Sequence, residues 1–562
     1  MRLRVAAPGV ALRVAIAGIA LLAGIPIIVA TVRAVIDGWT PYGDRAVIAL
    51  RSFDVFGPHS PAVGQYTQWS AVLGKPIFSP GPLLYWLLAI PARLGATALP
   101  IWIALVNLGC VLALLALARR RGGLPLVAAT ALLLPLMLRS LPSETFHDIW
   151  NPSTTLLPFL LTCFVAWSVA IGELALAPAL VLLLSFIVQT HSTFVVPGLG
   201  LLAVTVVALA IAARDRVRRR NWGARWLWGS VAVAVVCWAV PLGDQLAGSG
   251  NLRALVDASR AAQGHLGIAA GWHAIVRAFG IPPWWLGPSI GTPRRIMDVA
   301  VAPGWASQAA CGLMLAVLVG FLVAGLRRRQ LQVAVPAAAA LALVVSLGIV
   351  TALTPTEDDL QLTIAYTLWW ASPAGLFVWL MTGWLAARQL ARMGGARARS
   401  GLSAVRNRGR LPAFGDRGGA RPAVAVAAAT AIIAVLVAAG QPADVDRGDY
   451  RPFRSAAKAV TAAVGHARSI TIDAQPLFPA SELAYELAYA LKRDGVSVMV
   501  PPAVAAELGR SYVSHAQGGV RLEVTYGGRM GSPGSVLATV RVHRPAFPPG
   551  VFRVTLVAPD DG

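Results

Sequence analysis

Acidic side chains are scarce in this chain, and so are charged residues of any kind. Asp and Glu account for 25 of the 562 residues, and all charged residues together for only 13 %. With a mean hydropathy of +0.66, this shortage of charge excludes an ordinary soluble globular protein. Apolar runs of about 20 residues, the length that a helix needs to cross the bilayer core, recur along the chain. The sequence therefore predicts a polytopic α-helical membrane protein.

Cysteine is rare as well, which excludes a disulfide framework and a cysteine-rich metal site. The four cysteines each lie in a different apolar run, as small buried residues do: Cys110, Cys163, Cys237 and Cys311. The chain also lacks a phosphate-cradling glycine loop, a zinc-ligand spacing and a nucleophile elbow. The sequence thus identifies no cofactor and leaves only a divalent cation open.

Two acidic stretches are candidates for such a cation. "TEDDL" (356–360) is the densest acidic cluster of the chain, although a solvated loop is the favoured interpretation. "DVD" (444–446) mimics the metal motif of nucleotide-sugar transferases, but no nucleotide-binding fold precedes it. Neither stretch therefore predicts a metal site by itself.

Positive charge, by contrast, is concentrated between the apolar runs. Arginines cluster at residues 119–121, 214–220, 327–329 and 388–421, and the formal net charge is +23. Such clusters are expected on cytoplasmic loops, where they set the orientation of a membrane protein. No aromatic residues alternate with them as in a nucleic-acid-binding surface, so we expect no nucleic-acid partner.

With the arginine clusters inside, the pattern predicts eleven membrane helices and a cytoplasmic N-terminus. The spans are expected near residues 12–36, 98–118, 123–140, 152–171, 174–190, 194–213, 226–242, 304–326, 332–353, 366–387 and 422–440. The run "PGPLLYWLLAIPARLGA" (80–96) is short and interrupted by Pro91, and as a further span it would place later arginines outside. We therefore expect an interfacial helix on the outer surface.

The C-terminal part changes character. Residues 388–421 are rich in Arg and Gly and predict a disordered cytoplasmic linker before the last span, 422–440. In residues 441–562, alternating runs such as "RSITIDA" and "GVFRVTLVAP" predict strands. "SELAYELAYALKRDG" predicts a helix with Ser481 as N-cap and Gly495 as its stop. We expect a small α/β domain outside the membrane.

Polar residues gather in the predicted outer loops, of which the largest are 37–97 and 243–303. The first outer loop carries Asp44, Asp54, His59 and Lys75. Two shorter stretches, "PSETFHDIWNPS" and "VQTHST", add Glu144, His147, Asp148, Asn151, Gln189 and His191. All of these fall on one side of the membrane in a topology that was derived from arginines alone. The spans themselves hold almost no ionisable residues, which argues against an ion-coupled carrier.

The order of these features resembles the GT-C superfamily of polytopic glycosyltransferases. "GKPIFSPGPLLYW" (74–86) is similar to the Lys-Pro segment of aminoarabinose transferase and protein O-mannosyltransferase relatives. "WNPSTTLLPF" (150–159) is similar to the opening of their fourth span, with Asn151 where an acidic residue often stands and Asp148 three residues earlier. The resemblance covers residues 10–215. The Ala- and Arg-rich, Lys-poor composition also resembles that of arabinosyl- and mannosyltransferases of actinobacteria.

The resemblance implies a GT-C-like catalytic module over residues 1–387 of a plasma-membrane protein. Such enzymes transfer a sugar from a polyprenyl-phosphate donor to an envelope glycan, lipid or protein acceptor at the outer face, with inversion. It implies Asp44 as general base, and Lys75 as the cation for the donor phosphate, assisted by Arg45, His59 or Arg294 and Arg295. Substrate contacts are expected among Asp54, Glu144, His147, Asp148, Asn151 and His191.

Each assignment has a plainer alternative. Asp44 could serve only as the N-cap of the helix predicted after it. Asp54 lies three residues after Arg51, and a local ion pair is the favoured interpretation. Lys75 could extend to the interface without binding phosphate. At the level of the whole protein, the alternative to an enzyme is a lipid-linked-glycan transporter or scaffold that retains a GT-C-like frame.

Overall fold

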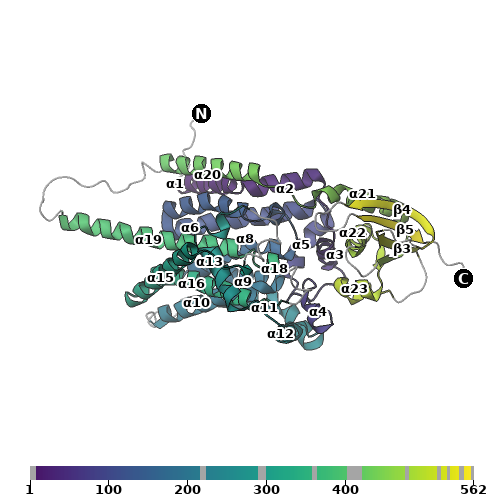
Figure 1. Ribbon diagram of the computed structural model, residues 1–562, viewed down its shortest axis with the longest axis horizontal. Helices are drawn as coiled ribbons and strands as arrows, with labels where there is room; N and C mark the ends of the chain where they lie inside the picture. The colour runs from purple at the N-terminus through teal and green to yellow at the C-terminus, as the bar shows by residue number, and fades with distance from the viewer. Residues whose placement is uncertain are drawn as a thin grey trace.

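A computed structural model describes residues 8–214, 223–288, 299–356, 364–401, 420–474, 480–514, 520–527, 532–542 and 550–557. A long helical bundle carries a small α/β domain at one end (Figure 1). Among the described residues, seven helices are long and apolar enough to cross a membrane. The predicted fold class, a helical membrane protein with a C-terminal sheet region, is confirmed.

The bundle helices follow the predicted spans closely. They are α1 Pro8–Ala23, α2 Ile25–Asp37, α6 Ala98–Arg139, α8 Leu156–Ala170, α9 Ala177–Thr190, α10 Val195–Arg214, α11 Ala224–Ala247, α15 Trp305–Arg327, α16 Leu331–Ala352, α19 Ala371–Gly401 and α20 Ala420–Gly440. Helices α1 and α2 meet at an angle of 52°, and together they are long and apolar enough to cross a membrane. Short helix α7, Asn151–Thr154, runs directly into α8.

Helix α6 reverses direction at Gly123, which adopts φ 66° and ψ −160°. Both of its ends lie beside the C-terminal domain: Arg454 donates to the Thr97 hydroxyl (3.3 Å), and Ser143 donates to the carbonyl of Pro442 (2.8 Å). A straight helix of this length would separate its ends by about 60 Å. The two predicted segments 98–118 and 123–140 are therefore the two legs of a hairpin.

The two fully described arginine clusters, residues 119–121 in the turn of α6 and 327–329 at the end of α15, lie at the opposite end of the bundle from the α/β domain (Figure 1). At that end, Arg121 pairs with Glu173, and Arg388 donates to Gln332 of α16 (3.0 Å). The arrangement is the one that a common cytoplasmic face for the arginines requires. Which end faces the cytoplasm stays a prediction.

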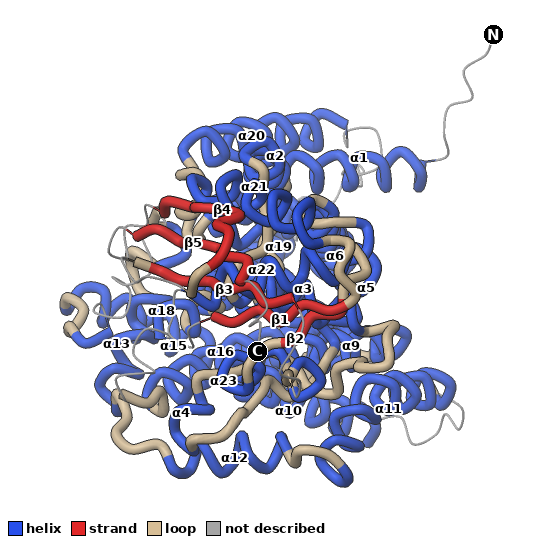
Figure 2. The backbone as a smooth tube through the Cα atoms, turned by 90° about the vertical axis from the view of Figure 1, so that its right-hand side faces the viewer, coloured by secondary structure: helices blue, strands red, loops and turns tan. Residues whose placement is uncertain are grey.

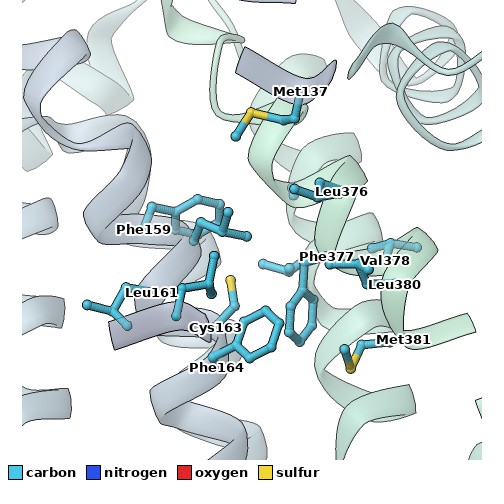
Figure 3. Close-up of a cluster of buried hydrophobic side chains, with 14 of the residues drawn as sticks. Met137, Phe159, Leu161, Cys163, Phe164, Leu376, Phe377, Val378, Leu380 and Met381 are labelled. Atoms are coloured by element: carbon cyan, nitrogen blue, oxygen red, sulfur yellow. The ribbon is translucent and has the colours of Figure 1, made fainter. Parts of the chain in front are cut away.

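Helix α8 forms the centre of the bundle, and every one of its side chains is buried. Figure 3 shows its aromatic and aliphatic side chains facing those of α19, with Met137 of α6 above them. Phe164 meets Phe377 edge-on, with ring centroids 5.5 Å apart. In a bilayer such close packing, rather than removal from water, holds helices together.

Four short helices cover the end of the bundle that faces the α/β domain. They are α3 Asp44–Asp54, α4 Trp69–Leu73, α5 Leu83–Leu94 and α12 Asn251–Ala261. Helix α5 is the predicted interfacial helix of residues 80–96, and at 12 residues with Pro91 inside it is too short to span. Helix α13, Gly267–Phe279, packs against α16.

The C-terminal domain combines helices α21 Arg447–Val464, α22 Ala480–Arg493 and α23 Pro502–Leu508 with a five-stranded sheet. The strands are β1 Ser469–Ala474, β2 Ser497–Met499, β3 Val520–Tyr526, β4 Gly534–Val542 and β5 Gly550–Val557, in the order β2-β1-β3-β5-β4. Strands β1, β2 and β3 are parallel, and β5 is antiparallel to both neighbours. Figure 2 looks along the bundle onto this domain, with the sheet in front of α22 and α3.

The structure departs from the predicted helix ends in two places. Helix α22 begins at Ala480, so Ser481 lies within its first turn, whereas Gly495 follows the helix with φ 89° as expected. At the start of α3, Gly43 rather than Asp44 occupies the N-cap position, with φ 52°. The plain N-cap alternative for Asp44 is therefore wrong, and its carboxylate is available for another contact.

Candidate active site

A cavity of about 950 Å³ opens at the end of the bundle that faces the C-terminal domain. One part of its wall is apolar and comes from α9, α10 and α11, with Leu184, Val188, Leu199, Leu202 and Trp238. The other part is polar and brings together Asp44, Gln68, Asn151, His191, His265 and Glu507. The cavity is therefore amphiphilic, with a carboxylate at its polar end and a hydrocarbon-like surface at the other.

Asp44 is the first residue of α3 and reaches solvent through this cavity. The backbone turn at Gly43 is pinned by the C-terminal domain, because the Gly43 amide donates to the Glu482 carbonyl (3.2 Å). The indole of Trp150 donates to Asp44 Oδ2 (3.0 Å). Desolvation by the surrounding protein raises the pKa of Asp44, while Trp150 and the charge of Arg45 act in the opposite direction.

Arg45 and Asp148 form a bidentate ion pair that contacts Trp150. Arg45 Nε lies 2.8 and 2.9 Å from the two carboxylate oxygens, and Nη2 lies 2.7 Å from Oδ2. Asp148 also accepts the Trp150 backbone amide (3.1 Å), and the guanidinium lies over the Trp150 ring. Two predicted site residues thus come together, but they contact Trp150 rather than the cavity. They hold in place the side chain that orients Asp44.

Glu144 and His147 lie in a second network, between the loop after α6 and the C-terminal domain. His147 Nε2 lies 2.9 Å from Asp444 Oδ2, which also accepts the Tyr450 hydroxyl (2.9 Å). Burial raises the pKa of Glu144 to about 7, and the nearby Asp444 adds to that effect. Asp444, from the "DVD" stretch, therefore joins the domain to the bundle.

Asp54 lies at the other end of α3 and is buried against the C-terminal domain. It accepts Arg51 Nη1 (3.3 Å) and the Tyr512 hydroxyl (2.7 Å), and it pairs with Lys492. The predicted local pair with Arg51 forms. Two partners from the C-terminal domain, which sequence spacing could not indicate, complete the cluster.

The predicted phosphate-binding residues of the first outer loop do not line the cavity. His59 and Lys75 are both exposed on loops, and Arg294 and Arg295 lie outside the described residues. Of the described residues that line the cavity, none is Lys or Arg. Asn151 and His191 do line it, and the Asn151 amide donates to the Thr190 carbonyl (3.3 Å).

Sequence reasoning missed several cavity residues, of which Glu507 is the clearest. Glu507 lies on α23, more than 450 residues along the chain from Asp44, and burial together with the charge of Asp44 raises its pKa to about 7. His265 lies on the loop before α13, which a backbone bridge to Pro355 holds in place. Neither residue belongs to a motif, because only the docking of distant segments brings it to the cavity.

No metal site is found in the described part of the chain. No three His, Cys, Asp or Glu side chains there lie close enough together to hold an ion. The acidic residues of the "TEDDL" stretch, Glu357, Asp358 and Asp359, lie outside the described residues.

The sequence matches no protein-family model and no curated protein. Its structure is similar to that of ArnT from Cupriavidus metallidurans bound to undecaprenyl phosphate, with a TM-score of 0.51 at 15 % identity over 95 % of this chain and 97 % of ArnT. The chain has the GT-C fold. The apo state of the same ArnT gives a TM-score of 0.46 at 16 % identity over the same shares of the two chains. The archaeal oligosaccharyltransferase AglB from Archaeoglobus fulgidus gives 0.36 at 13 % identity, over 91 % of this chain and 69 % of AglB.

Proposed function

We propose that this protein is an integral membrane glycosyltransferase that moves a sugar from a polyprenyl-phosphate donor to an acceptor hydroxyl, with inversion. The observation that carries the proposal is the amphiphilic cavity, in which the Asp44 carboxylate and a long apolar wall belong to one space. A general base and a hydrophobic lipid tract are the two elements that such a reaction requires. The GT-C fold supports the same class of reaction.

The apolar wall fits a prenyl chain. Leu199 and Leu202 of α10 line the cavity and are 60 % and 39 % exposed. Together with Leu184 and Val188 of α9 they form a surface between two apolar helices. A polyprenyl tail can lie along it while its head group reaches the polar end. The undecaprenyl phosphate in the ArnT structure makes this carrier the first one to test.

In the proposed step, Asp44 takes the proton of the acceptor hydroxyl as its oxygen attacks the anomeric carbon. The new glycosidic bond forms on the face opposite the phosphate, and the bond to the phosphate oxygen breaks with its electron pair on the departing polyprenyl phosphate. The raised pKa of Asp44 makes the carboxylate a stronger base than an ordinary aspartate. Trp150 holds it in a fixed orientation, and the Arg45–Asp148 pair holds Trp150.

The proposed location follows from the two ends of the bundle. With the arginine-rich end in the cytoplasm, the cavity and the domain 441–562 lie outside the plasma membrane. Residues 1–387 would then form the catalytic module, 388–421 a cytoplasmic linker and 422–440 the last span. An acceptor from the envelope, whether glycan, lipid or protein, would approach from the side of the C-terminal domain.

The test is a transfer assay on the purified full chain in lipid nanodiscs. A panel of polyprenyl-phosphate sugars, with arabinose, mannose and aminoarabinose as head groups, is combined with an extract of envelope acceptors. We expect labelled product and free polyprenyl phosphate from at least one donor. If the protein binds polyprenyl phosphate but no donor is consumed, the alternative of a transporter or scaffold replaces the enzyme.

A further inference from the structure

The start of helix α10 opens directly into the cavity. His191, Ser192 and Thr193 all line it. The first turn, Ser192–Phe194, is a 3₁₀ turn that continues into α10, so that Ser192–Ala213 forms one apolar helix of 22 residues. This is therefore the N-terminus of a long helix that points its first turn at the polar end of the cavity.

The first amides of this helix have no backbone acceptor among the described residues. The amides on either side are satisfied: His191 donates to the Ile187 carbonyl (3.0 Å) and Phe194 to that of His191 (3.1 Å). The amides of Ser192 and Thr193 stand between them. Free first-turn amides carry the positive end of the helix dipole and bind anions.

A second observation concerns the side chain of His191. The residue is 8 % exposed, and its Nδ1 is buried with no hydrogen-bond partner in the described structure. Burial lowers the pKa of His191 to about 4, so the ring is neutral at physiological pH. A buried polar nitrogen without a partner is costly unless a ligand supplies one. The ring is held in place by edge contacts with Phe194 and Tyr366.

The charges around the cavity indicate where an anion can go. Asp44 and Glu507 are its two carboxylates, and the described lining contains no Lys or Arg. A phosphate is therefore repelled from the end that holds Asp44 and Glu507. Among the described lining residues, the start of α10 combines two amides without a backbone acceptor and a buried imidazole nitrogen without a partner, and so it is the part best suited to an anion.

We propose that the start of α10 is the phosphate subsite of the donor: the amides and hydroxyls of Ser192 and Thr193, with His191, bind the phosphate of a polyprenyl-phosphate lipid. This inference rests on the proposed function, which it deepens. It assigns the phosphate to helix amides and a neutral imidazole rather than to the exposed Lys75.

The surroundings of this subsite fit the rest of the donor. Val195, Leu199 and Leu202 line the cavity at three, seven and ten positions after Ser192, and so lie on the same face of α10. The prenyl chain can therefore follow that face away from the phosphate. On the other side, the Tyr366 ring lies between His191 and Trp150, with centroid distances of 6.1 and 4.6 Å. The sugar would lie over these rings, between the phosphate and Asp44.

The test compares undecaprenyl phosphate with undecaprenol, which lacks only the phosphate. Binding of each lipid to the purified full chain is measured by native mass spectrometry or by quenching of tryptophan fluorescence. The His191→Phe variant keeps the aromatic packing and removes the nitrogen. We expect its affinity for undecaprenyl phosphate to fall about tenfold while undecaprenol binds as before. Loss of one hydroxyl in Ser192→Ala or Thr193→Val should cost about threefold.

Three controls make the result specific. His466→Phe changes an exposed histidine of the C-terminal domain and should leave both affinities unchanged. His191→Gln restores a side-chain donor and should recover part of the phosphate affinity. His265→Phe removes the other histidine of the described cavity lining and should retain the preference for phosphate. The proposal is overturned if His191→Phe keeps that preference, if both lipids lose affinity together, or if His265→Phe abolishes the preference instead.

The binding test is independent of catalysis. Asp44→Asn removes a carboxylate that repels the phosphate, so it should bind undecaprenyl phosphate at least as tightly as the wild type while losing transfer. If no donor is consumed but His191→Phe loses its preference, the subsite stands and the proposed enzyme fails. If transfer occurs and His191→Phe keeps the preference, the enzyme stands and the subsite is wrong.

Discussion

Helix α3 carries one aspartate at each end, and the two have opposite surroundings. Asp54 is buried and has three partners, of which Lys492 and Tyr512 come from the C-terminal domain. Asp44 faces the cavity, and its neighbouring donors, the indole of Trp150 and the side-chain amide of Gln65, are neutral. A carboxylate surrounded by cations stabilises the structure and has no free oxygen for a substrate. A carboxylate with neutral donors and a raised pKa can accept a proton.

The largest effect is expected when Asp44, the aspartate that faces the cavity, is replaced. Asp44→Asn keeps the shape of the side chain and the contact with Trp150 but removes the base. We expect the transfer rate to fall by about 100-fold or more, with an unchanged thermal unfolding midpoint. The matched control Asp494→Asn, at an exposed position of the C-terminal domain, should retain full activity. Wild-type turnover by Asp44→Asn would end the proposed mechanism.

Asp54→Asn tests the expected structural role of the buried aspartate. The substitution leaves Arg51 and Lys492 without their shared carboxylate, at a contact between the bundle and the C-terminal domain. We expect a loss of about 2 kcal/mol in stability, measured by thermal or denaturant unfolding in detergent. The turnover of the folded fraction should stay near the wild-type value. A variant with full stability and no turnover would reverse the roles of the two aspartates.

Trp150→Phe sharpens the electrostatic part of the comparison. The indole hydrogen bond favours the charged form of Asp44 and so lowers its pKa. Without it the pKa of Asp44 rises further, and the base is protonated over a wider range. The acidic limb of the kcat/KM profile should therefore move to higher pH. A profile that keeps its shape while only its height changes would show that Trp150 acts by packing alone.

The smallest expected effect concerns Glu486, a buried carboxylate at the interface that forms no ion pair with the described residues, although the charge of Arg454 acts on it. Glu486 accepts the Thr40 hydroxyl (2.9 Å), its other oxygen has no partner among the described residues, and burial raises its pKa to about 8. A folded-state pKa above the ordinary value of 4.5 means that its contribution is full below about pH 4.5 and is lost as pH rises toward 8.

Glu486→Gln should therefore raise the unfolding midpoint at pH 8 and leave it nearly unchanged at pH 5. Unfolding curves of the variant and the wild type at both pH values check this expectation. An equal change at the two pH values would show that the titration of Glu486 does not affect the docking of the domain.

Much of the architecture could be predicted from the sequence, because hydrocarbon imposes simple rules on a chain. Length and polarity locate the spans, and the arginine count requires α5 to lie at the interface instead of crossing. Period-two alternation was sufficient to locate the strands of the C-terminal domain. The position of Asp44 at the start of α3 could also be predicted from the sequence, because this residue comes soon after the first predicted span.

The rest of the site depends on contacts between distant segments. Nothing near Glu507 in the sequence indicates that α23 reaches the cavity, and the Asp444–His147 contact joins residues 297 positions apart. We expected Arg45 and Asp148 to contact the substrate because both are charged. The sequence does not indicate that they pair with each other instead. His59 and Lys75 lie in the expected loop yet remain exposed, because loop length alone does not say which side chains turn inward.

The most direct test of the central claim is a cryo-electron microscopy map of the full chain with undecaprenyl phosphate in nanodiscs. The account predicts lipid density in the cavity of Asp44, with the phosphate beside residues 191–193 and the tail along α9 and α10. Density for the lipid phosphate at the arginine-rich end of the bundle, with this cavity empty, would contradict it.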